Sequence, residues 1–418
     1  MAKYIQLALA WAVALSVSLP AVAQAQQPPP LPPECQTGQL STGDPQYPVQ
    51  LILICLPPVG DWNGQVVAYA HGYAAPQAPL SLPLGELTLP DANGQLVFGP
   101  AALLRRGFAF VTTSYRKNGS VIEQGGKDLQ ALVEHFNTQV APHPAHKVFV
   151  AGGSEGGLIT TMLLERNPDT YAGGLVLCGP VGGGPFQIKY LGDFRVVFDY
   201  FFPDVFPFGA VNVPPDAFED WESRYVPAIT QAILGHPSET EQLFNVTRAA
   251  RDPEDPTGSA ITTARGVLFY SIFGTNDLKD TADGVAYENR FTFYHGSNND
   301  FALNLGVERI KSDSGARRYI RRFYQTTGDL HRPIVTLHTL RDGAVPFTHE
   351  LLYLGQVILS GHSDNLTVLP VDRYGHCNFT VEEVLGSFTI LLLQSGGYLD
   401  ARLADYLPSL PQPYRGDE

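Results

Sequence analysis

The segment from Lys147 to Arg166, KVFVAGGSEGGLITTMLLER, constrains the fold more than any other part of the chain. A short run rich in β-branched and apolar residues passes into a stretch with helical spacing through a turn that contains four glycines. A strand that leads so directly into a helix is typical of β/α units in a parallel sheet. Glycines are expected where the backbone turns too tightly for side chains. The segment therefore predicts a strand, a tight turn that exposes Ser154, and a helix.

The sequence on both sides continues this alternation of strands and helices, with turn signals between the elements. The pair Asn63-Gly64 lies between the first two expected strands and favours a hairpin that joins them. The expected strands are residues 49–57, 64–72, 108–115, 147–151, 171–179, 333–340 and 365–371, and the expected helices are 100–107, 128–140, 155–168, 348–361 and 381–394.

Between Pro185 and Thr327 the alternation stops. This segment is rich in aromatic residues and prolines, as in FDYFFPDVFPFG, and carries helical patterns without clear strands. We therefore expect an α/β fold with a mostly parallel, doubly wound sheet and a large, mainly helical cap inserted between strands. The core is expected over residues 35–184 and 328–418, and the cap over residues 185–327.

The N-terminus has the composition of a targeting segment. Lys3 precedes a short apolar stretch, and AVAQAQ offers cleavage after Ala23 or Ala25. We expect a signal peptide over residues 1–25, a proline-rich leader over 26–34, and a secreted or periplasmic protein without a membrane span. The formal net charge of −14 argues against a nucleic-acid partner, because phosphate binding requires clustered positive charge.

Export permits disulfides, and the chain has four cysteines, Cys35, Cys55, Cys178 and Cys377, which allow three pairings. Cys178 ends an expected strand and Cys377 follows another, so both are expected at the carboxyl edge of the sheet. A Cys178–Cys377 bond would tether the loop that follows the expected strand 365–371 to the sheet. A Cys35–Cys55 bond would fasten the proline-rich leader. Buried thiols are the alternative.

Residues 152–156 match the pattern Gly-x-Ser-x-Gly between a strand and a helix, which is the context of a nucleophilic serine. Such a serine needs a base and a group that orients the base. Asp342 and His376 each follow a later expected strand, in the order acid and then histidine. Asp372, on the same loop as His376, is the alternative acid.

An oxyanion requires backbone donors. The candidates are the amide of Glu155, next to Ser154, and the amide of Tyr73, in the loop after the strand that ends at HG. Two interpretations remain for the Glu155 side chain. Its carboxylate could interact favourably with the positive end of the helix dipole, or it could face the cleft and bind a cationic group.

The motifs HGYAAP, GGSEGG, HTLRDGAVP and RYGHC together resemble the α/β-hydrolase superfamily, in particular secreted serine esterases and peptidases. The resemblance covers residues 48–184 and 333–395. It implies that Ser154, Asp342 and His376 are nucleophile, acid and base.

Three functions are consistent with these observations. The first is hydrolysis of small or polymer-derived carboxylic esters. The second is a peptidase or amidase activity, such as that of an aminopeptidase. The run from Arg341 to Gly361 resembles the acid loops of prolyl-oligopeptidase-like enzymes, and Glu155 could hold an N-terminal amine of the substrate. The third is a binding protein without catalysis. No metal or organic cofactor is implied. The aromatic residues of the cap, such as Phe201, Phe202 and Phe206, are expected either in the core of the cap or in a substrate pocket.

Overall fold

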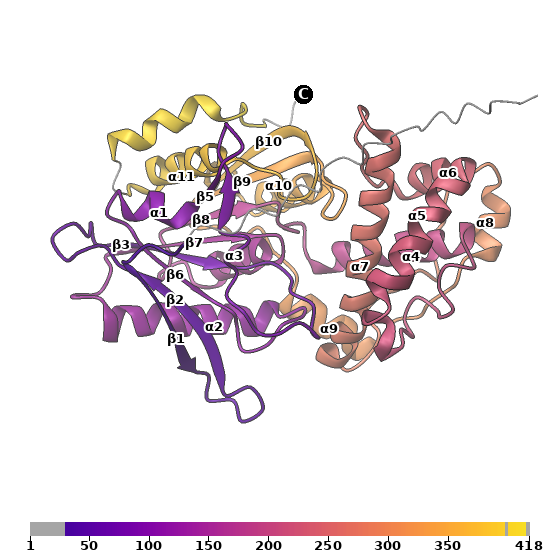
Figure 1. Ribbon diagram of the computed structural model, residues 1–418, viewed down its shortest axis with the longest axis horizontal. Helices are drawn as coiled ribbons and strands as arrows, with labels where there is room; N and C mark the ends of the chain where they lie inside the picture. Colours follow the sequence, from indigo (N-terminus) through magenta and orange to yellow (C-terminus); the bar gives the residue numbers. More distant parts are fainter. Residues whose placement is uncertain (1–29, 398–399, 415–418) are drawn as a thin grey trace, which may run out of the picture.

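The computed structural model describes residues 30–397 and 400–414. The predicted signal peptide and the first part of the predicted leader lie outside these residues. The structure has an α/β core beside a lobe of helices (Figure 1).

The core is built on an eight-stranded sheet with the order β1-β2-β6-β3-β7-β8-β9-β10 over the described residues. The pairings β1–β2 and β2–β6 are antiparallel, and every pairing from β6 to β10 is parallel. The strands are β1 Cys35–Ser41, β2 Val49–Cys55, β3 Gln65–Ala70, β6 Ala109–Thr113, β7 Lys147–Gly153, β8 Gly173–Leu177, β9 Ile334–Arg341 and β10 Leu366–Tyr374, and a separate ribbon pairs β4 Thr88–Pro90 with β5 Leu96–Phe98.

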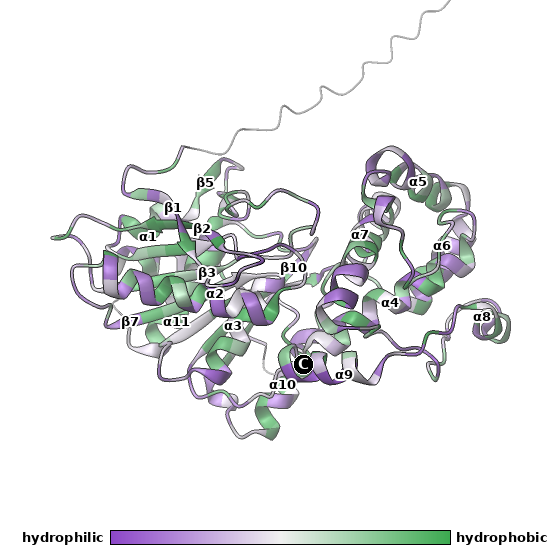
Figure 2. Cartoon of the chain, turned by 90° about the horizontal axis from the view of Figure 1, so that it is seen from below, coloured by the Kyte–Doolittle hydropathy of each residue, from purple (hydrophilic) through white to green (hydrophobic). Residues whose placement is uncertain are grey.

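Helices cover both faces of the sheet because successive side chains of each strand point to opposite faces. In β3, Val66 and Ala68 pack in one apolar cluster with residues of α2, α3 and α10. Val67 and Tyr69 pack in another cluster with residues of α1 and α11. Figure 2 shows the strands mainly in the green of hydrophobic residues. The helices of the core are α1 Gly99–Leu104, α2 Ile122–His135, α3 Glu155–Arg166, α10 Thr348–Leu359 and α11 Val381–Ser395.

The predicted hairpin at Asn63-Gly64 is wrong. β2 and β3 are not neighbours, because β6 lies between them and is parallel to β3. Gly64 does turn the chain, with φ 77°, but the connection that it ends passes over the position of β6 before the chain enters β3. The hairpin partner of β2 is β1, an element that the sequence did not predict. Cys35 lies opposite Cys55 in its register.

The chain between β8 and β9 is helical, and no strand occurs within its described residues. Its apolar residues form a cluster of their own, which includes side chains of α4, α5, α6 and α7. The helices in this segment are α4 Gly184–Phe201, α5 Val226–Gly235, α6 Pro237–Thr247, α7 Pro256–Ala282, α8 Asp300–Gly306 and α9 Ser314–Phe323.

Among the described residues, no helix combines the length and the hydropathy that a crossing of the bilayer requires.

Candidate active site

Ser154 lies on the sharp turn between β7 and α3. Its backbone has φ 53° and ψ −122°, a conformation that costs a non-glycine residue on the order of 1–3 kcal/mol. The surrounding glycines make the turn possible. A Cβ on Gly152 would lie 2.2 Å from the carbonyl oxygen of Gly156, and a Cβ on Gly156 would lie 2.0 Å from the carbonyl oxygen of Ala70. Side chains at these positions would push the turn away from the sheet.

The turn brings Ser154 to His376 and Asp342, although the three residues come from distant parts of the chain. The Ser154 Oγ lies 2.8 Å from His376 Nε2, and His376 Nδ1 lies 2.7 Å from Asp342 Oδ2. Asp342 follows β9 and His376 follows β10, and both strands end at the edge of the sheet where β7 ends. The alternative acid, Asp372, is exposed and pairs with Arg341.

The Asp342 carboxylate is buried and fixed on both oxygens. Oδ1 accepts hydrogen bonds from the backbone amides of Ala344 and Val345, at 2.8 and 2.9 Å. Burial alone would raise the pKa of this carboxyl, but the nearby imidazoles of His376 and His338 hold it well below its usual range. Asp342 is therefore ionised and can stabilise a positive charge on His376.

His338 and Glu350 form a second buried pair, and His338 lies next to Asp342. His338 Nδ1 lies 2.9 Å from Glu350 Oε1, and Nε2 lies 2.9 Å from the Val345 carbonyl oxygen and 3.6 Å from Asp342 Oδ2. Burial opposes a charge on His338, but contacts with Asp342 and Glu350 outweigh this effect and raise its pKa to about 10. A charged His338 can donate to both Glu350 and the Val345 carbonyl oxygen, and its positive charge lies beside Asp342.

The loop after β3 passes close to the serine, which is where an oxyanion donor is needed. A Cβ on Gly72 would lie 3.2 Å from the Cβ of Ser154. The Glu86 carboxylate holds this loop, because it accepts hydrogen bonds from the Gly72 amide, at 2.9 Å, and from the Tyr69 hydroxyl, at 3.2 Å. The Tyr73 amide has no acceptor among the described residues. The Glu155 amide is the first of α3, where no intrahelical acceptor exists.

The Glu155 side chain is buried and turns toward the start of α2. It accepts a hydrogen bond of 2.7 Å from the Val121 amide. Burial, together with the charges of Asp277 and Glu86, raises the pKa of Glu155 to about 8 despite this bond. At neutral pH the carboxyl is therefore mostly protonated, so no full negative charge lies beside the developing oxyanion.

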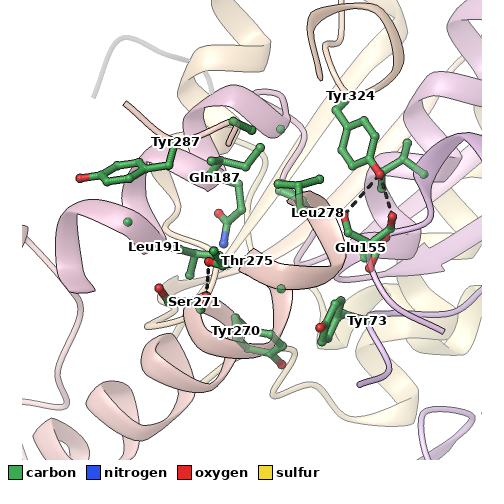
Figure 3. A pocket seen from close by; sticks show the side chains of 18 of the residues that line it. Tyr73, Glu155, Gln187, Leu191, Tyr270, Ser271, Thr275, Leu278, Tyr287 and Tyr324 are labelled. Atoms are coloured by element: carbon green, nitrogen blue, oxygen red, sulfur yellow. Dashed lines mark hydrogen bonds between the residues drawn. The ribbon is translucent and has the colours of Figure 1, made fainter. Parts of the chain in front are cut away.

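A cavity of about 140 Å³ opens beside Ser154, between the α/β core and the helical segment (Figure 3). Tyr270 of α7 forms part of its wall, and its ring lies 6.4 Å from that of His376 and 5.8 Å from that of Tyr73. Apart from Ser154, its lining includes Tyr73, Ile122, Glu155, Leu158, Ile188, Leu191, Tyr270, Leu278, Tyr287, Tyr324 and Val345.

The cap phenylalanines that the sequence offered as pocket residues lie elsewhere. Phe202 and Phe206 are buried in the apolar cluster of the helical segment, and Phe201 packs against it. None of the three lines the cavity beside Ser154. Phe202 contacts Phe198, one turn earlier in the chain, with the rings 4.8 Å apart, and Phe206 contacts Tyr225, with the rings 5.2 Å apart. The residues that do line the cavity on this side come mainly from α4 and α7.

Both disulfides that the sequence favoured are present. Cys178 is bonded to Cys377, with the Cα atoms 5.3 Å apart, and Cys35 is bonded to Cys55. The first bond joins the residue after β8 to the residue after His376. Cys178 and Cys377 both adopt positive φ, at 48° and 51°, as Ser154 does. The disulfide thus fixes the histidine loop to the edge of the sheet.

A comparison with known families matches residues 115–226 to a family model described as serine aminopeptidase, S33. This segment contains Ser154 and its helix, but neither Asp342 nor His376. No curated protein sequence matches the chain.

Several solved structures are similar at low identity. Acylaminoacyl peptidase from Pyrococcus horikoshii is 9% identical, with a TM-score of 0.45, and the alignment covers 88% of this chain and 42% of that one. A puromycin hydrolase is 12% identical (TM-score 0.41, 87% and 40% covered). A serine hydrolase from the polyaromatic-hydrocarbon-degrading bacterium Cycloclasticus zankles is 12% identical (TM-score 0.41, 88% and 100% covered). The chain thus spans less than half the length of the first two.

The assignment rests on the sheet order, the position of Ser154 between β7 and α3, and the family model that matches this region. These observations identify the α/β-hydrolase fold, and residues 115–226 match the serine aminopeptidase family model.

Proposed function

We propose that the protein is a secreted esterase that hydrolyses carboxylic esters through an acyl-enzyme on Ser154. The observation that carries this proposal is the unbroken chain of contacts from Ser154 Oγ through His376 to Asp342, with 2.8 and 2.7 Å between the heavy atoms. A serine hydroxyl without such a base is a poor nucleophile.

In the proposed mechanism, His376 Nε2 takes the proton of Ser154 Oγ as the oxygen attacks the ester carbonyl carbon. Asp342 accepts from Nδ1 and stabilises the imidazolium. The amides of Tyr73 and Glu155 donate to the oxyanion. His376 then gives its proton to the departing alkoxide oxygen, which leaves as the alcohol. Water then attacks the acyl carbonyl carbon while His376 takes its proton, and His376 returns this proton to Ser154 Oγ as the acid leaves.

The cavity indicates the class of acyl group. Its volume of about 140 Å³ resembles that of an engineered apolar cavity, of about 150 Å³, that accommodates benzene. Most of its lining side chains are aliphatic or aromatic. We therefore propose that the acyl group is short or aromatic. We also propose that the chain consists of a core over residues 35–184 and 328–418 and a cap over residues 185–327, whose helices exclude water from the acyl group.

A peptidase or amidase activity at the same site is the second candidate. The description of the matching family model, serine aminopeptidase, favours it. An aminopeptidase needs an anion that binds the substrate amine, and the raised pKa of Glu155 makes this residue a weak candidate for that role. This is why we rank the esterase first.

Export is part of the proposal. Disulfides persist in oxidising compartments, and the two disulfides of the structure agree with the predicted signal peptide.

A substrate panel tests the proposal. We expect turnover of p-nitrophenyl acetate and butyrate to exceed that of the laurate ester, and to exceed that of aminoacyl-p-nitroanilides by at least about tenfold in kcat/KM. In the folded Ser154→Ala variant, kcat should fall by several orders of magnitude. A preference for the anilides would establish the peptidase instead. Ester turnover near the wild-type level in Ser154→Ala would exclude both.

A further inference from the structure

Three metal-binding side chains meet at the edge of the sheet opposite Ser154. Asp329 and His331 lie in the loop that leads into β9, and His362 lies between α10 and β10. Asp342 and His376 follow the other ends of the same two strands, and Ser154 follows β7 at that end of the sheet. An eight-residue strand such as β9 spans roughly 25 Å, so the two groups of residues are well separated.

The ligand atoms of these side chains converge on one point. Asp329 Oδ1 lies 3.1 Å from His331 Nε2 and 3.2 Å from His362 Nε2. The two imidazole rings are 4.6 Å apart and nearly perpendicular, at 76°. Two ligands of a tetrahedral zinc ion, at bonds of 2.0–2.2 Å, are about 3.3 Å apart. The two separations from the carboxylate are close to that value, and one ligand atom from each of the three side chains lies within 4.8 Å of the other two.

The backbone that carries these residues is fixed on both sides. The Glu165 carboxylate of α3 accepts hydrogen bonds from the amides of Thr327 and Gly328, at 2.9 and 2.7 Å. Leu330, between Asp329 and His331, is fully buried. Its carbonyl oxygen accepts a hydrogen bond of 2.8 Å from the Asn365 side chain, three residues after His362. The two loops are therefore tied to each other, which preorganises the ligands.

The neighbouring cation does not compete for the carboxylate. Arg332 follows His331 directly, but its Nε donates to the Pro168 carbonyl oxygen at 2.7 Å. Asp329 and His331 are exposed and His362 is partly exposed, so an ion can reach the site from solvent and water can complete its coordination.

We propose that Asp329, His331 and His362 form a zinc-binding site that joins the loop before β9 to the turn before β10. Two neutral imidazoles and one carboxylate suit zinc, copper or nickel, whereas calcium and magnesium prefer oxygen ligands. The site has an open fourth position, but the ester-cleaving chemistry lies at the other edge of the sheet. Its role is therefore to stabilise the fold, and it does not depend on the function proposed for Ser154.

The test uses the full chain without a histidine tag, stripped of metal with a chelator and titrated with Zn²⁺ in a calorimeter. We expect one zinc per chain. His331→Gln and His362→Gln should each weaken binding by at least about tenfold, because each removes one of three protein ligands. His236→Gln is the matched control, since it replaces an exposed histidine on the helical segment and should leave the affinity unchanged.

Thermal unfolding gives a second readout. Zinc should raise the melting temperature of the wild type and of His236→Gln by a few degrees, and should not raise that of His362→Gln, because only the folded site binds the ion tightly. Absence of saturable binding would overturn the proposal. So would zinc binding that is unchanged in both His331→Gln and His362→Gln, or that is lost in His376→Ala instead.

Discussion

Glu155 is the residue whose chemistry is least expected next to a nucleophile. Its pKa of about 8 lies above the ordinary value of 4.5, because the folded protein buries the carboxyl. The folded state therefore binds this proton more tightly than the unfolded state does. The stabilisation is fully present below about pH 4.5 and is lost as the pH rises through about 8, with a total change on the order of a few kcal/mol.

We predict that Glu155→Gln removes this pH dependence. Glutamine can still accept from the Val121 amide but has no proton to lose. Between pH 5 and 9 the free energy of unfolding of the wild type should fall relative to that of the variant, as measured by urea denaturation. The wild-type kcat/KM should also decline above about pH 8, where a carboxylate forms beside the oxyanion, while that of Glu155→Gln should not. Profiles of equal shape would refute this role.

Local pattern was enough to predict Ser154, Asp342 and His376 as neighbours, because each follows a strand and the ends of parallel strands meet at one edge. The local pattern did not predict the residues that hold these three and their neighbouring loops in position. Glu86, His338 and Glu350 act through contacts made only in the folded chain. The one available signal was a histidine inside an otherwise apolar strand, at His338, which requires a buried partner.

At the scale of elements, the error at Asn63-Gly64 has a physical origin. The pair encodes a turn, and a turn between two strands suggests a hairpin, but the turn does not determine which strand lies next in the sheet. β6 pairs with both β2 and β3, and this long-range choice depends on packing. β1 was missed because its polar, exposed sequence, CQTGQLS, lacks the apolar alternation of a half-buried strand.

The disulfide between Cys178 and Cys377 yields a prediction at this scale. It fixes the loop that carries His376, so the double variant Cys178→Ser/Cys377→Ser should lose at least about tenfold in kcat, because a displaced base is costly. It should also lose stability, by up to about 4–5 kcal/mol in the chain-entropy model, since the bond spans 199 residues.

The other disulfide provides the matched control. Cys35→Ser/Cys55→Ser opens a loop of 20 residues at the far edge of the sheet. It should lower the stability but leave kcat within about twofold for p-nitrophenyl butyrate. Equal kcat values in the two double variants would show that the Cys178–Cys377 bond does not position the base.

At the scale of the whole molecule, the helical segment is attached to the catalytic edge by polar contacts. The Tyr190 hydroxyl donates to the Gly343 carbonyl oxygen at 2.6 Å, and the Gln187 side chain donates to that of Ala344 at 2.8 Å. Both acceptors follow Asp342. The break in the strand pattern predicted that helices are inserted here, but not which of them face the site. That depends on how α4 and α7 pack, which is why Tyr270 was missed and why the sequence left open whether the three phenylalanines lie in the core of the cap or in the pocket.

In the proposed enzyme, Ser154 is a nucleophile that His376 activates. The most direct measurement is the mass of the protein after reaction with a fluorophosphonate, which phosphonylates an activated serine and releases fluoride. We predict one adduct per chain, located on the peptide that contains Ser154, no adduct in Ser154→Ala, and labelling slowed by at least about a hundredfold in His376→Ala. An adduct on another residue, or no adduct in wild-type protein that hydrolyses p-nitrophenyl butyrate, would contradict the account.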